Sequence, residues 1–332
     1  MMRAPTYLRV VATTKCPLSC SYCHMEGDTH QDGTAWELSA EVLDACLAVA
    51  VDAGIRKFKF LGGEPLARRD LPERVARLRA LAPGADLSVI TSGVAPLSTV
   101  DALLGAGLDR MNVSIHGFGL DAFAERSRLP ARHHALRTAV IEDLLSRGRP
   151  VKLNYVYTGP ASEADLRALL DWAADKPLLV NILDELGNEA MSSQTLLSLL
   201  LRLRGQWVEQ YEEPDPDSLP TTRLRFSDGL HVEIKTSQLG RVAPWQDCAT
   251  CVARSRCREG IYAVRLTHRG QLQPCMDRPD VSLPLRDLLE RGHAAALGAW
   301  QRFIDLRLHG CEPPAIHVGP RRLPVLQPGG GQ

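Results

Sequence analysis

The sequence lacks an excess of charge of either sign, an N-terminal leader and a long apolar run, and each absence excludes a class of protein. Lys+Arg and Asp+Glu number 39 each among 332 residues, so no global basic field favours nucleic acid as a partner. No charged-then-apolar leader is visible, and no apolar run approaches membrane-spanning length. We therefore expect a cytoplasmic protein without nucleic-acid or membrane partners.

Cysteine is the residue type whose distribution is most informative. Nine is an odd count, and seven of the nine fall into two tight groups, which in a reducing compartment favours metal binding over disulfides. Cys46 stands at helical spacing with Val42 and Ala50 and is expected in the core, whereas Cys311 is expected to be a surface or packing residue. The two groups are Cys16, Cys20 and Cys23, and Cys248, Cys251, Cys257 and Cys275.

The first group lies on one short loop with the spacing C-x3-C-x2-C, just after the first strand-like run. Four cysteine ligands are usual for a four-iron cluster, so three would leave one iron open to a small molecule. A zinc site is the alternative, although zinc-binding cysteines usually come as C-x2-C pairs closed by two further ligands. Zinc is also the alternative for the second group, because four cysteines hold either kind of centre.

Strand-like and helix-like segments alternate up to about residue 212, which is the pattern of parallel βα repeats. Six such units predict an α/β fold, a partial (βα)6 TIM-like barrel over residues 1–212. A polar, proline-containing run at 212–220 marks a boundary, so residues 213–332 are expected to form a smaller α+β domain with a flexible end. We expect strands at 7–13, 56–61, 87–92, 110–116, 151–157 and 178–184, helices at 40–53, 99–106, 163–175, 192–212, 284–291 and 293–308, and a hairpin at 223–236.

The expected barrel strands alternate apolar with polar residues, which places polar side chains on the inner face. A barrel packed only for stability is filled with branched apolar residues, so a polar interior predicts a binding chamber. Unpaired buried charge is costly, and interior cations therefore indicate an anionic ligand, unless they lie in solvent or pair with Glu64, Asp184 or Glu185. The interior residues that we expect to contact a substrate are Arg9, Lys57, Lys59, Lys152 and Asn154.

Two motifs resemble those of the radical S-adenosylmethionine (SAM) enzymes. The first is Cys16-Pro-Leu-Ser-Cys20-Ser-Tyr22-Cys23, with an aromatic residue before its last cysteine, and the second is Gly62-Gly63-Glu64-Pro65. The resemblance implies a [4Fe-4S] cluster whose open iron is chelated by SAM, with the second motif holding the methionyl amino group. It also implies one-electron cleavage of SAM to a 5′-deoxyadenosyl radical that abstracts a substrate hydrogen, and an electron donor such as ferredoxin or flavodoxin.

Further segments resemble one group of this superfamily, the GTP 3′,8-cyclases of molybdenum-cofactor biosynthesis. In that family the positions that match Arg9, Lys57 and Lys152 are basic and hold the triphosphate of the nucleotide. The resemblance also places Thr91, Ser92 and Ser114 close to the cofactor. The matching segments are Leu8-Arg9, Lys57-x-Lys59-x-x-Gly-Gly-Glu-Pro, Thr91-Ser92-Gly93, Val113-Ser114-Ile115 and Val151-Lys152-Leu153-Asn154.

The second cysteine group resembles the auxiliary-cluster region of radical enzymes that carry a SPASM or shortened twitch extension. Its two halves are joined by an alternating strand at 262–267 and a turn at 268–270, so we expect a hairpin with cysteines at its ends. The resemblance implies one auxiliary [4Fe-4S] cluster. It argues against a second, because Ile261 stands where another cysteine would be needed.

The chain departs from the cyclase pattern in three places. His116 stands where the cyclases carry aspartate, and it is either a catalytic proton donor or substrate contact, or a satisfied hydrogen-bonding residue. The cyclases leave an auxiliary iron open to the purine by using three cysteines, whereas this chain offers four. Arg265 matches a substrate-contacting arginine, but Ala263 replaces a second one, which argues against GTP itself as the substrate.

We predict a radical SAM enzyme that takes hydrogen from a small anionic biosynthetic substrate, a nucleotide or sugar nucleotide, and drives C–C bond formation or rearrangement. The auxiliary cluster would close the chamber that holds this substrate. One alternative is a peptide-modifying enzyme of the SPASM type, for which the segment before the first strand is short. The other is a sensor or scaffold that binds an iron–sulfur cluster or zinc and has no enzymatic activity.

Overall fold

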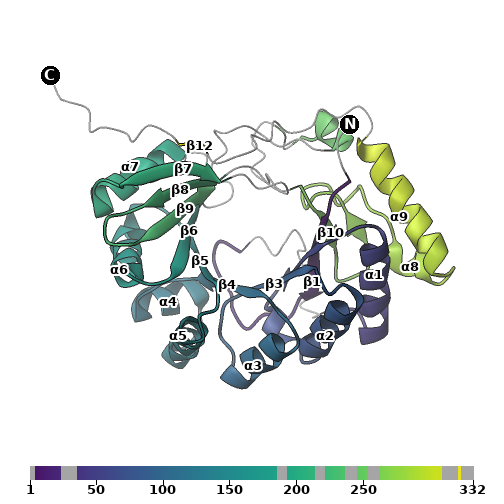
Figure 1. The fold of residues 1–332 in the computed structure, drawn as a ribbon, viewed down its shortest axis with the longest axis horizontal. Helices are drawn as coiled ribbons and strands as arrows, with labels where there is room; N and C mark the ends of the chain where they lie inside the picture. The colour runs from purple at the N-terminus through teal and green to yellow at the C-terminus, as the bar shows by residue number, and fades with distance from the viewer. Residues whose placement is uncertain are drawn as a thin grey trace.

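The computed structural model describes residues 4–23, 36–184, 193–213, 221–235, 245–252, 254, 262–308 and 321–322. Strands line the inside of a curved arrangement, and helices cover its outside (Figure 1). The strands are β1 Tyr7–Thr13, β2 Lys57–Gly62, β3 Asp86–Thr91, β4 Arg110–Ile115, β5 Val151–Tyr157, β6 Leu178–Asp184, β7 Glu209–Glu213, β8 Thr221–Arg225, β9 His231–Lys235, β10 Val264–Leu266, β11 Leu272–Gln273 and β12 Arg321–Arg322. The α-helices are α1 Ala40–Asp52, α2 Leu71–Leu81, α3 Leu97–Gly105, α4 Leu120–Ser127, α5 Ala131–Ser146, α6 Glu163–Ala173, α7 Ser193–Arg204, α8 Leu285–Leu289 and α9 His293–Leu308.

Strands β1 to β6 lie side by side in chain order, each parallel to the next. The alternation of their residues explains the layers, because the apolar set of each strand faces the helices and is excluded from water. Phe58 and Phe60 of β2, for example, are fully buried, while Lys57 and Lys59 between them point to the other face. The predicted α/β fold is thereby confirmed, and the parallel core is consistent with a partial TIM-like barrel.

The sheet continues beyond these six strands on both sides. β9 is parallel to β6 and is followed by antiparallel β8 and β7, while β10 is parallel to β1 and pairs with antiparallel β11. Strands from before and after the predicted boundary thus share one sheet, which has twelve strands in the described part of the chain. The boundary run at 214–220 lies outside the described residues, and the division into two domains stays a prediction.

The predicted helix at 192–212 is wrong in its second half. α7 ends at Arg204, and Gly205 follows with a φ of 78°, a left-handed conformation that glycine adopts without steric cost. The chain then forms β7, and Trp207 is buried edge-on against Phe226, with the ring centroids 6.4 Å apart. Leucine periodicity predicted the helix, but the glycine ends it.

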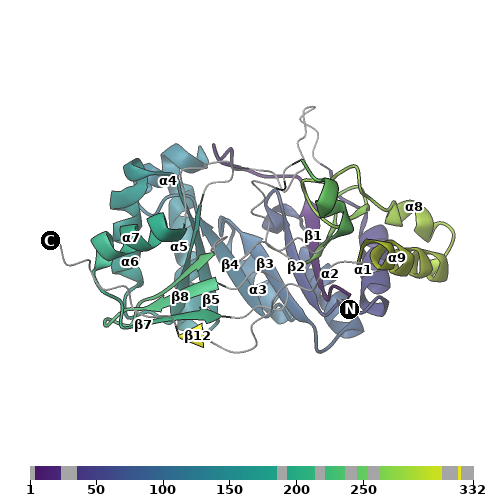
Figure 2. The ribbon, with the colours of Figure 1, turned by 90° about the horizontal axis from the view of Figure 1, so that it is seen from above.

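The C-terminal helices pack beside the first helix of the barrel. α8 and α9 contact α1, at the end of the molecule opposite α7 (Figure 2). Cys46 of α1 is fully buried, as predicted for a core residue.

No helix in the described part of the chain has the length and apolar character needed to cross a bilayer. Cys257, Cys311 and the glycine-rich end at 327–332 lie outside the described residues.

Candidate active site

The first cysteine group follows the carboxyl end of β1. Cys16 and Cys23 are exposed and Cys20 is half-buried. The loop rests on the end of α4, because the Ser19 N–H donates to the Ser127 carbonyl at 3.1 Å. The parallel strands of the barrel all end at this same edge, so the loop lies where parallel α/β folds commonly carry their active sites.

The electrostatics of these thiols indicate that they lie close together. Burial raises the pKa of Cys16 to about 11 and that of Cys20 to about 12, and the thiolates of the group add to both shifts by mutual repulsion. Three neighbouring thiolates therefore require a cation among them to stay ionised at neutral pH.

The Gly62-Gly63 pair packs directly against the segment that leads into the cysteine loop. A Cβ at Gly62 would lie 2.3 Å from the Thr13 carbonyl oxygen, and one at Gly63 would lie 2.4 Å from that of Lys15. Gly63 N–H also donates to the Thr13 carbonyl at 2.9 Å, and Glu64 N–H to that of Lys15 at 2.7 Å. Only glycine permits this approach, so the two predicted motifs are joined backbone to backbone.

The Glu64 carboxylate connects the ends of β2 and β3. It accepts hydrogen bonds from the Thr91 hydroxyl at 2.6 Å, from the Ser92 N–H at 2.7 Å and from the Ser92 hydroxyl at 2.6 Å. It also accepts from the Leu66 N–H, where Pro65 begins a short 3-10 turn, and it is only 3% exposed. The structure thus brings the predicted cofactor residues Gly62 to Pro65, Thr91 and Ser92 together. Within this set the Glu64 carboxylate is hydrogen-bonded to the Thr91 and Ser92 hydroxyls.

Arg68 is a residue of this region that the sequence analysis missed. Its guanidinium is 3% exposed and donates to the Ala12 carbonyl at 2.9 Å and to the two Asp70 oxygens at 2.8 and 3.1 Å. It therefore fixes the end of β1 against the loop after β2. The sequence signal for it was an arginine two residues before an aspartate, just after the glycine motif, because this spacing permits a bidentate arginine–carboxylate pair.

Tyr22 connects the cysteine loop to the barrel. Its ring stacks on His116 with centroids 6.1 Å apart and planes at 19°, and the Arg126 guanidinium lies 5.2 Å from the same ring. Arg126 also lies 5.1 Å from the Tyr155 ring and was not predicted. Ser114, two residues before His116 on the inner face of β4, is half-buried.

His116 is 9% exposed, and its Nδ1 has no hydrogen-bond partner among the described residues. Burial lowers the pKa of its imidazole to about 4, and the charges of Arg137 and Arg126 lower it further. The ring is therefore neutral at pH 7 and has no imidazolium proton to donate. Its buried, unpartnered nitrogen is instead placed for a hydrogen bond to a ligand.

Three predicted cationic residues lie abreast on the inner face of the sheet. Arg265 of β10 is in register with Arg9 of β1, which is in register with Lys59 of β2. Arg265 and Arg9 are 4% and 8% exposed. We call these three residues the cationic row. Lys57, one alternation earlier on β2, lies 4.6 Å from the centroid of the Tyr7 ring.

Lys59 shows how strongly positive this region is. Burial lowers the pKa of its ammonium to about 7, and the charges of Arg9, Lys57, Arg110 and Lys152 contribute to the shift. No acidic side chain of the described residues forms an ion pair with Lys59. An anion at this position would offset both the desolvation of the ammonium and its repulsion by the neighbouring cations.

Lys152, another predicted cation, has a buried acidic partner. Its ammonium forms an ion pair with Glu233 of β9, whose other oxygen accepts from the Arg223 Nε at 3.1 Å. The partners considered from the sequence were Glu64, Asp184 and Glu185, but Glu64 is hydrogen-bonded elsewhere and the other two side chains lie outside the described residues. Asn154, next to Lys152 along the inner face, accepts from Asn181 at 2.9 Å.

The second cysteine group is described for Cys248, Cys251 and Cys275, which are all half-buried. The predicted hairpin is formed by β10 and β11, with Gly270 in its turn at a φ of 75°. The Arg278 guanidinium donates to the Asp247 carbonyl at 2.7 Å, which ties the segment after Cys275 to the turn that carries Cys248 and Cys251. Cys275 follows β11, which runs opposite to β1, so it leaves the sheet on the side away from Cys16.

The comparisons with known proteins agree with this geometry. The family model of the Radical SAM superfamily matches residues 10–173. A probable GTP 3′,8-cyclase of Methanocella arvoryzae is 28% identical over 317 residues, covering 93% of this chain and 95% of that protein. A probable GTP 3′,8-cyclase of Metallosphaera sedula is 30% identical over 278 residues, covering 82% of this chain and 81% of that protein. The chain belongs to the radical SAM superfamily. It is a radical SAM enzyme, and membership implies a [4Fe-4S] cluster and SAM.

A solved structure supports the fold. The crystal structure of Streptococcus suis SuiB bound to S-adenosylmethionine matches with a TM-score of 0.58 at 16% identity. The match covers 82% of this chain and 60% of that chain, so the likeness concerns the shared architecture alone.

The donor set of the first cysteine group fits the cluster of a radical SAM enzyme. Three thiolates on one loop supply three of the four ligands that a four-iron cluster needs, and the cluster would supply the cation that their mutual repulsion calls for. The described residues hold no ready-made arrangement of three metal ligands. The side chains of Cys16, Cys20 and Cys23 would therefore complete their geometry around the cluster itself.

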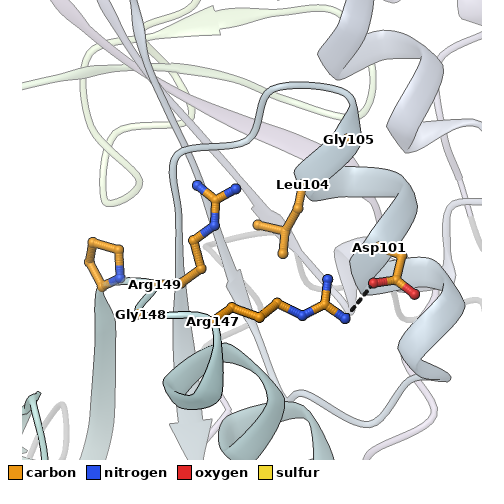
Figure 3. A pocket seen from close by; sticks show the side chains of 7 residues that line it. Asp101, Leu104, Gly105, Arg147, Gly148 and Arg149 are labelled. Atoms are coloured by element: carbon orange, nitrogen blue, oxygen red, sulfur yellow. Dashed lines mark ion pairs between the residues drawn. The ribbon is translucent and has the colours of Figure 1, made fainter.

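A hollow on the outer surface of this radical SAM enzyme lies apart from these groups. It has a volume of about 540 Å³ and is formed where α3 and α5 end and β5 begins (Figure 3). Since the cysteine loop follows the carboxyl end of β1, the hollow lies at the opposite edge of the parallel sheet. Arg147 there forms an ion pair with Asp101 at 2.7 Å. Because no predicted site residue lines it, the hollow is not part of the candidate active site.

Proposed function

We propose that this radical SAM enzyme takes hydrogen from a small anionic, nucleotide-like substrate inside the partial barrel and so drives C–C bond formation or rearrangement. The observation that carries the proposal is the cationic row. Burial and four neighbouring positive charges lower the pKa of its Lys59 to about 7. No acidic side chain of the described residues pairs with Lys59, and a polyphosphate beside it would offset the cost of its desolvation. The names of the cyclase relatives support a nucleotide, and the departures at His116 and Ala263 favour one other than GTP.

The residues of the cysteine loop and its surroundings would hold the cofactor. The bound cluster and SAM supply a 5′-deoxyadenosyl radical, and this chain's own residues orient the substrate C–H bond and exclude water. Substrate contacts are proposed for the cationic row and for Lys57, Lys152 and Asn154. Cluster ligands are proposed to be Cys16, Cys20 and Cys23, and cofactor contacts to be Tyr22, Gly62, Gly63, Glu64, Pro65, Thr91, Ser92 and Ser114.

His116 is proposed to contact the substrate or SAM through its buried Nδ1. The stack with Tyr22 would hold the imidazole plane, so that the nitrogen points to one place in the chamber. Because the ring is neutral at pH 7, its contribution would be a hydrogen bond and not the donation of a proton from imidazolium.

The second cysteine group is proposed to hold an auxiliary [4Fe-4S] cluster through Cys248, Cys251, Cys257 and Cys275. An external reductant such as ferredoxin or flavodoxin would supply the electron. Iron analysis after anaerobic reconstitution tests the auxiliary cluster, because two four-iron clusters give about eight irons per chain and a zinc-filled second site gives about four.

Titration of the reconstituted enzyme with GTP, ATP, UDP-glucose and inorganic tripolyphosphate tests the anionic substrate class. We expect at least one of these probes to bind, and R9Q and K59Q to weaken binding by about tenfold or more, because each removes a charge from the row. R149Q serves as the matched control, since Arg149 is exposed on the outer surface. Equal affinity in wild type, R9Q and K59Q would contradict the proposal.

A further inference from the structure

Glu233 places a negative charge on the inner face of the sheet, which also carries the cationic row. It lies in the middle of β9, between the fully buried Val232 and Ile234 of the opposite face, and is 4% exposed. In register it stands beside Asn181 of β6 on one side and Arg223 of β8 on the other. No motif of the superfamily marked this residue, because its strand lies beyond the six strands of the barrel.

The carboxylate is ionised in the folded protein. Burial alone would raise the pKa of Glu233, but the Lys152 ammonium and the Arg223 guanidinium together lower it below its usual value. The three side chains carry two positive charges and one negative charge. A phosphate that approached Lys152 would therefore meet the Glu233 charge, which it does not meet at the cationic row.

The same wall carries hydrogen-bond acceptors that nothing described satisfies. Asn181 uses its Nδ2 to donate to Asn154, and its Oδ1 has no partner among the described residues. The Oδ1 of Asn112, which is in register with Lys152, likewise has none. Asn181 and Asn112 are 7% and 5% exposed, so each oxygen is a buried acceptor without a donor.

The acceptors and the cations lie at different heights in the barrel. Asn154, Asn181 and Glu233, which we call the amide–acid row, are in register with Ser114 of β4. The cationic row is in register, through Ser88, with Arg110 of β4. Four residues of strand separate Arg110 from Ser114, which corresponds to about 13 Å along β4, with the amide–acid row nearer the cysteine loop.

We infer that Glu233 determines the specificity of the site. Its charge makes the wall of the amide–acid row a binding surface for the hydroxyl and amino groups of the substrate, and it keeps the phosphates at the cationic row. The inference rests on the proposed function and gives the substrate a direction. Its sugar or base, with the C–H bond to be attacked, lies toward the cysteine loop, and its phosphates lie deeper in the barrel. Donor groups of the substrate would complete the hydrogen bonds of Asn181, Asn112 and Glu233.

The test compares a probe that carries sugar and base donor groups with one that consists of phosphate alone. Wild type and E233Q are titrated with inorganic tripolyphosphate and with whichever of GTP, ATP and UDP-glucose binds wild type more tightly. We expect E233Q to lower the preference for the nucleotide over tripolyphosphate by about tenfold or more, because the substitution removes the charge that binds donors and repels phosphate. N181L is expected to lower the preference in the same direction and leaves every charge in place.

The matched control is E209Q, since Glu209 pairs with Arg225 in the same sheet at 3.0 Å but lies on β7. Iron content and melting temperature are measured for every variant, and N181L carries the test if E233Q fails to fold. A preference that stays within about twofold of wild type in both variants would overturn the inference while leaving the anionic substrate class intact. Failure of wild type to bind any of the four probes would instead contradict the proposed function, and this inference with it.

Discussion

The low pKa of Lys59 predicts that an anion binds together with a proton. At its pKa of about 7, the ammonium of the ligand-free enzyme is half protonated at pH 7 and about one-tenth protonated at pH 8. A polyphosphate beside it favours the charged form, so the bound enzyme keeps Lys59 protonated. Binding at pH 8 should therefore take up about 0.9 proton per chain from the buffer.

The same linkage fixes the pH dependence of affinity. If Lys59 of the bound enzyme stays protonated up to pH 9, the association constant falls by about 50-fold between pH 7 and pH 9. The reason is that the fraction of ligand-free enzyme with a protonated Lys59, the form that binds the anion, falls by that factor. Isothermal titration with tripolyphosphate in buffers of different ionisation enthalpy measures both the proton uptake and the affinity. The same titrations of a variant without a titrating group at position 59 correct for proton exchange by the probe itself.

K59R is the matched variant, because arginine stays charged over this range. Its affinity should be nearly independent of pH between 7 and 9, and its binding should take up no proton at pH 8. Refutation would come from wild type that binds tripolyphosphate without proton uptake and with the same pH dependence as K59R. In that case Lys59 is not at the anion, and the cationic row is not the site.

Three further predictions concern the surroundings of the cofactor. Gly63→Ala should reduce the iron retained after reconstitution and lower the melting temperature, because its Cβ would lie 2.4 Å from the Lys15 carbonyl oxygen. The control Gly105→Ala, whose Cβ would have nothing within 4 Å, should change neither quantity. Equal behaviour of the two variants would contradict the close packing at Gly63. Glu64→Gln should lower the free energy of unfolding by about 2 kcal/mol in urea titrations, because an amide cannot accept all the hydrogen bonds from Thr91 and Ser92. Since the pKa of His116 is about 4 when folded and 6.5 in a model peptide, wild type should lose up to about 3 kcal/mol relative to His116→Asn as the pH falls from 6.5 to 4, and parallel stability curves would show that the imidazole is not buried as described.

Much of the fold was predictable because the strands alternate so regularly. β1, β5 and β6 have the predicted bounds, and the cationic residues of the inner face follow from period two alone. The end of α7 was not predicted, because four leucines and one tryptophan at helical spacing outweighed a single glycine. Tertiary pairing of β7 with β8 decided that segment, and such pairing is not visible in local sequence.

The candidate site was predictable where motifs carried it and not where long-range contacts built it. The two motifs predicted that Gly62 to Pro65 belong with the cysteine loop, and the backbone contacts of Gly63 and Glu64 agree. Nothing local indicated that Glu233, 81 residues after Lys152, would be its ion-pair partner, because that pair depends on β9 adding to the edge of the barrel. The lowered pKa of His116 likewise follows first from its burial and then from the charges of Arg137 and Arg126, which reach it only in the folded chain.

Formation of 5′-deoxyadenosine is the measurement that tests the central claim most directly. The anaerobically reconstituted enzyme is mixed with SAM and a strong one-electron reductant, and the nucleoside is quantified by chromatography. We predict its formation in wild type and in C275A, and its loss in C20A, because only the first cysteine group binds the cluster that SAM completes. The absence of 5′-deoxyadenosine under every reductant tried, with Cys16, Cys20 and Cys23 intact and iron present, would contradict the account.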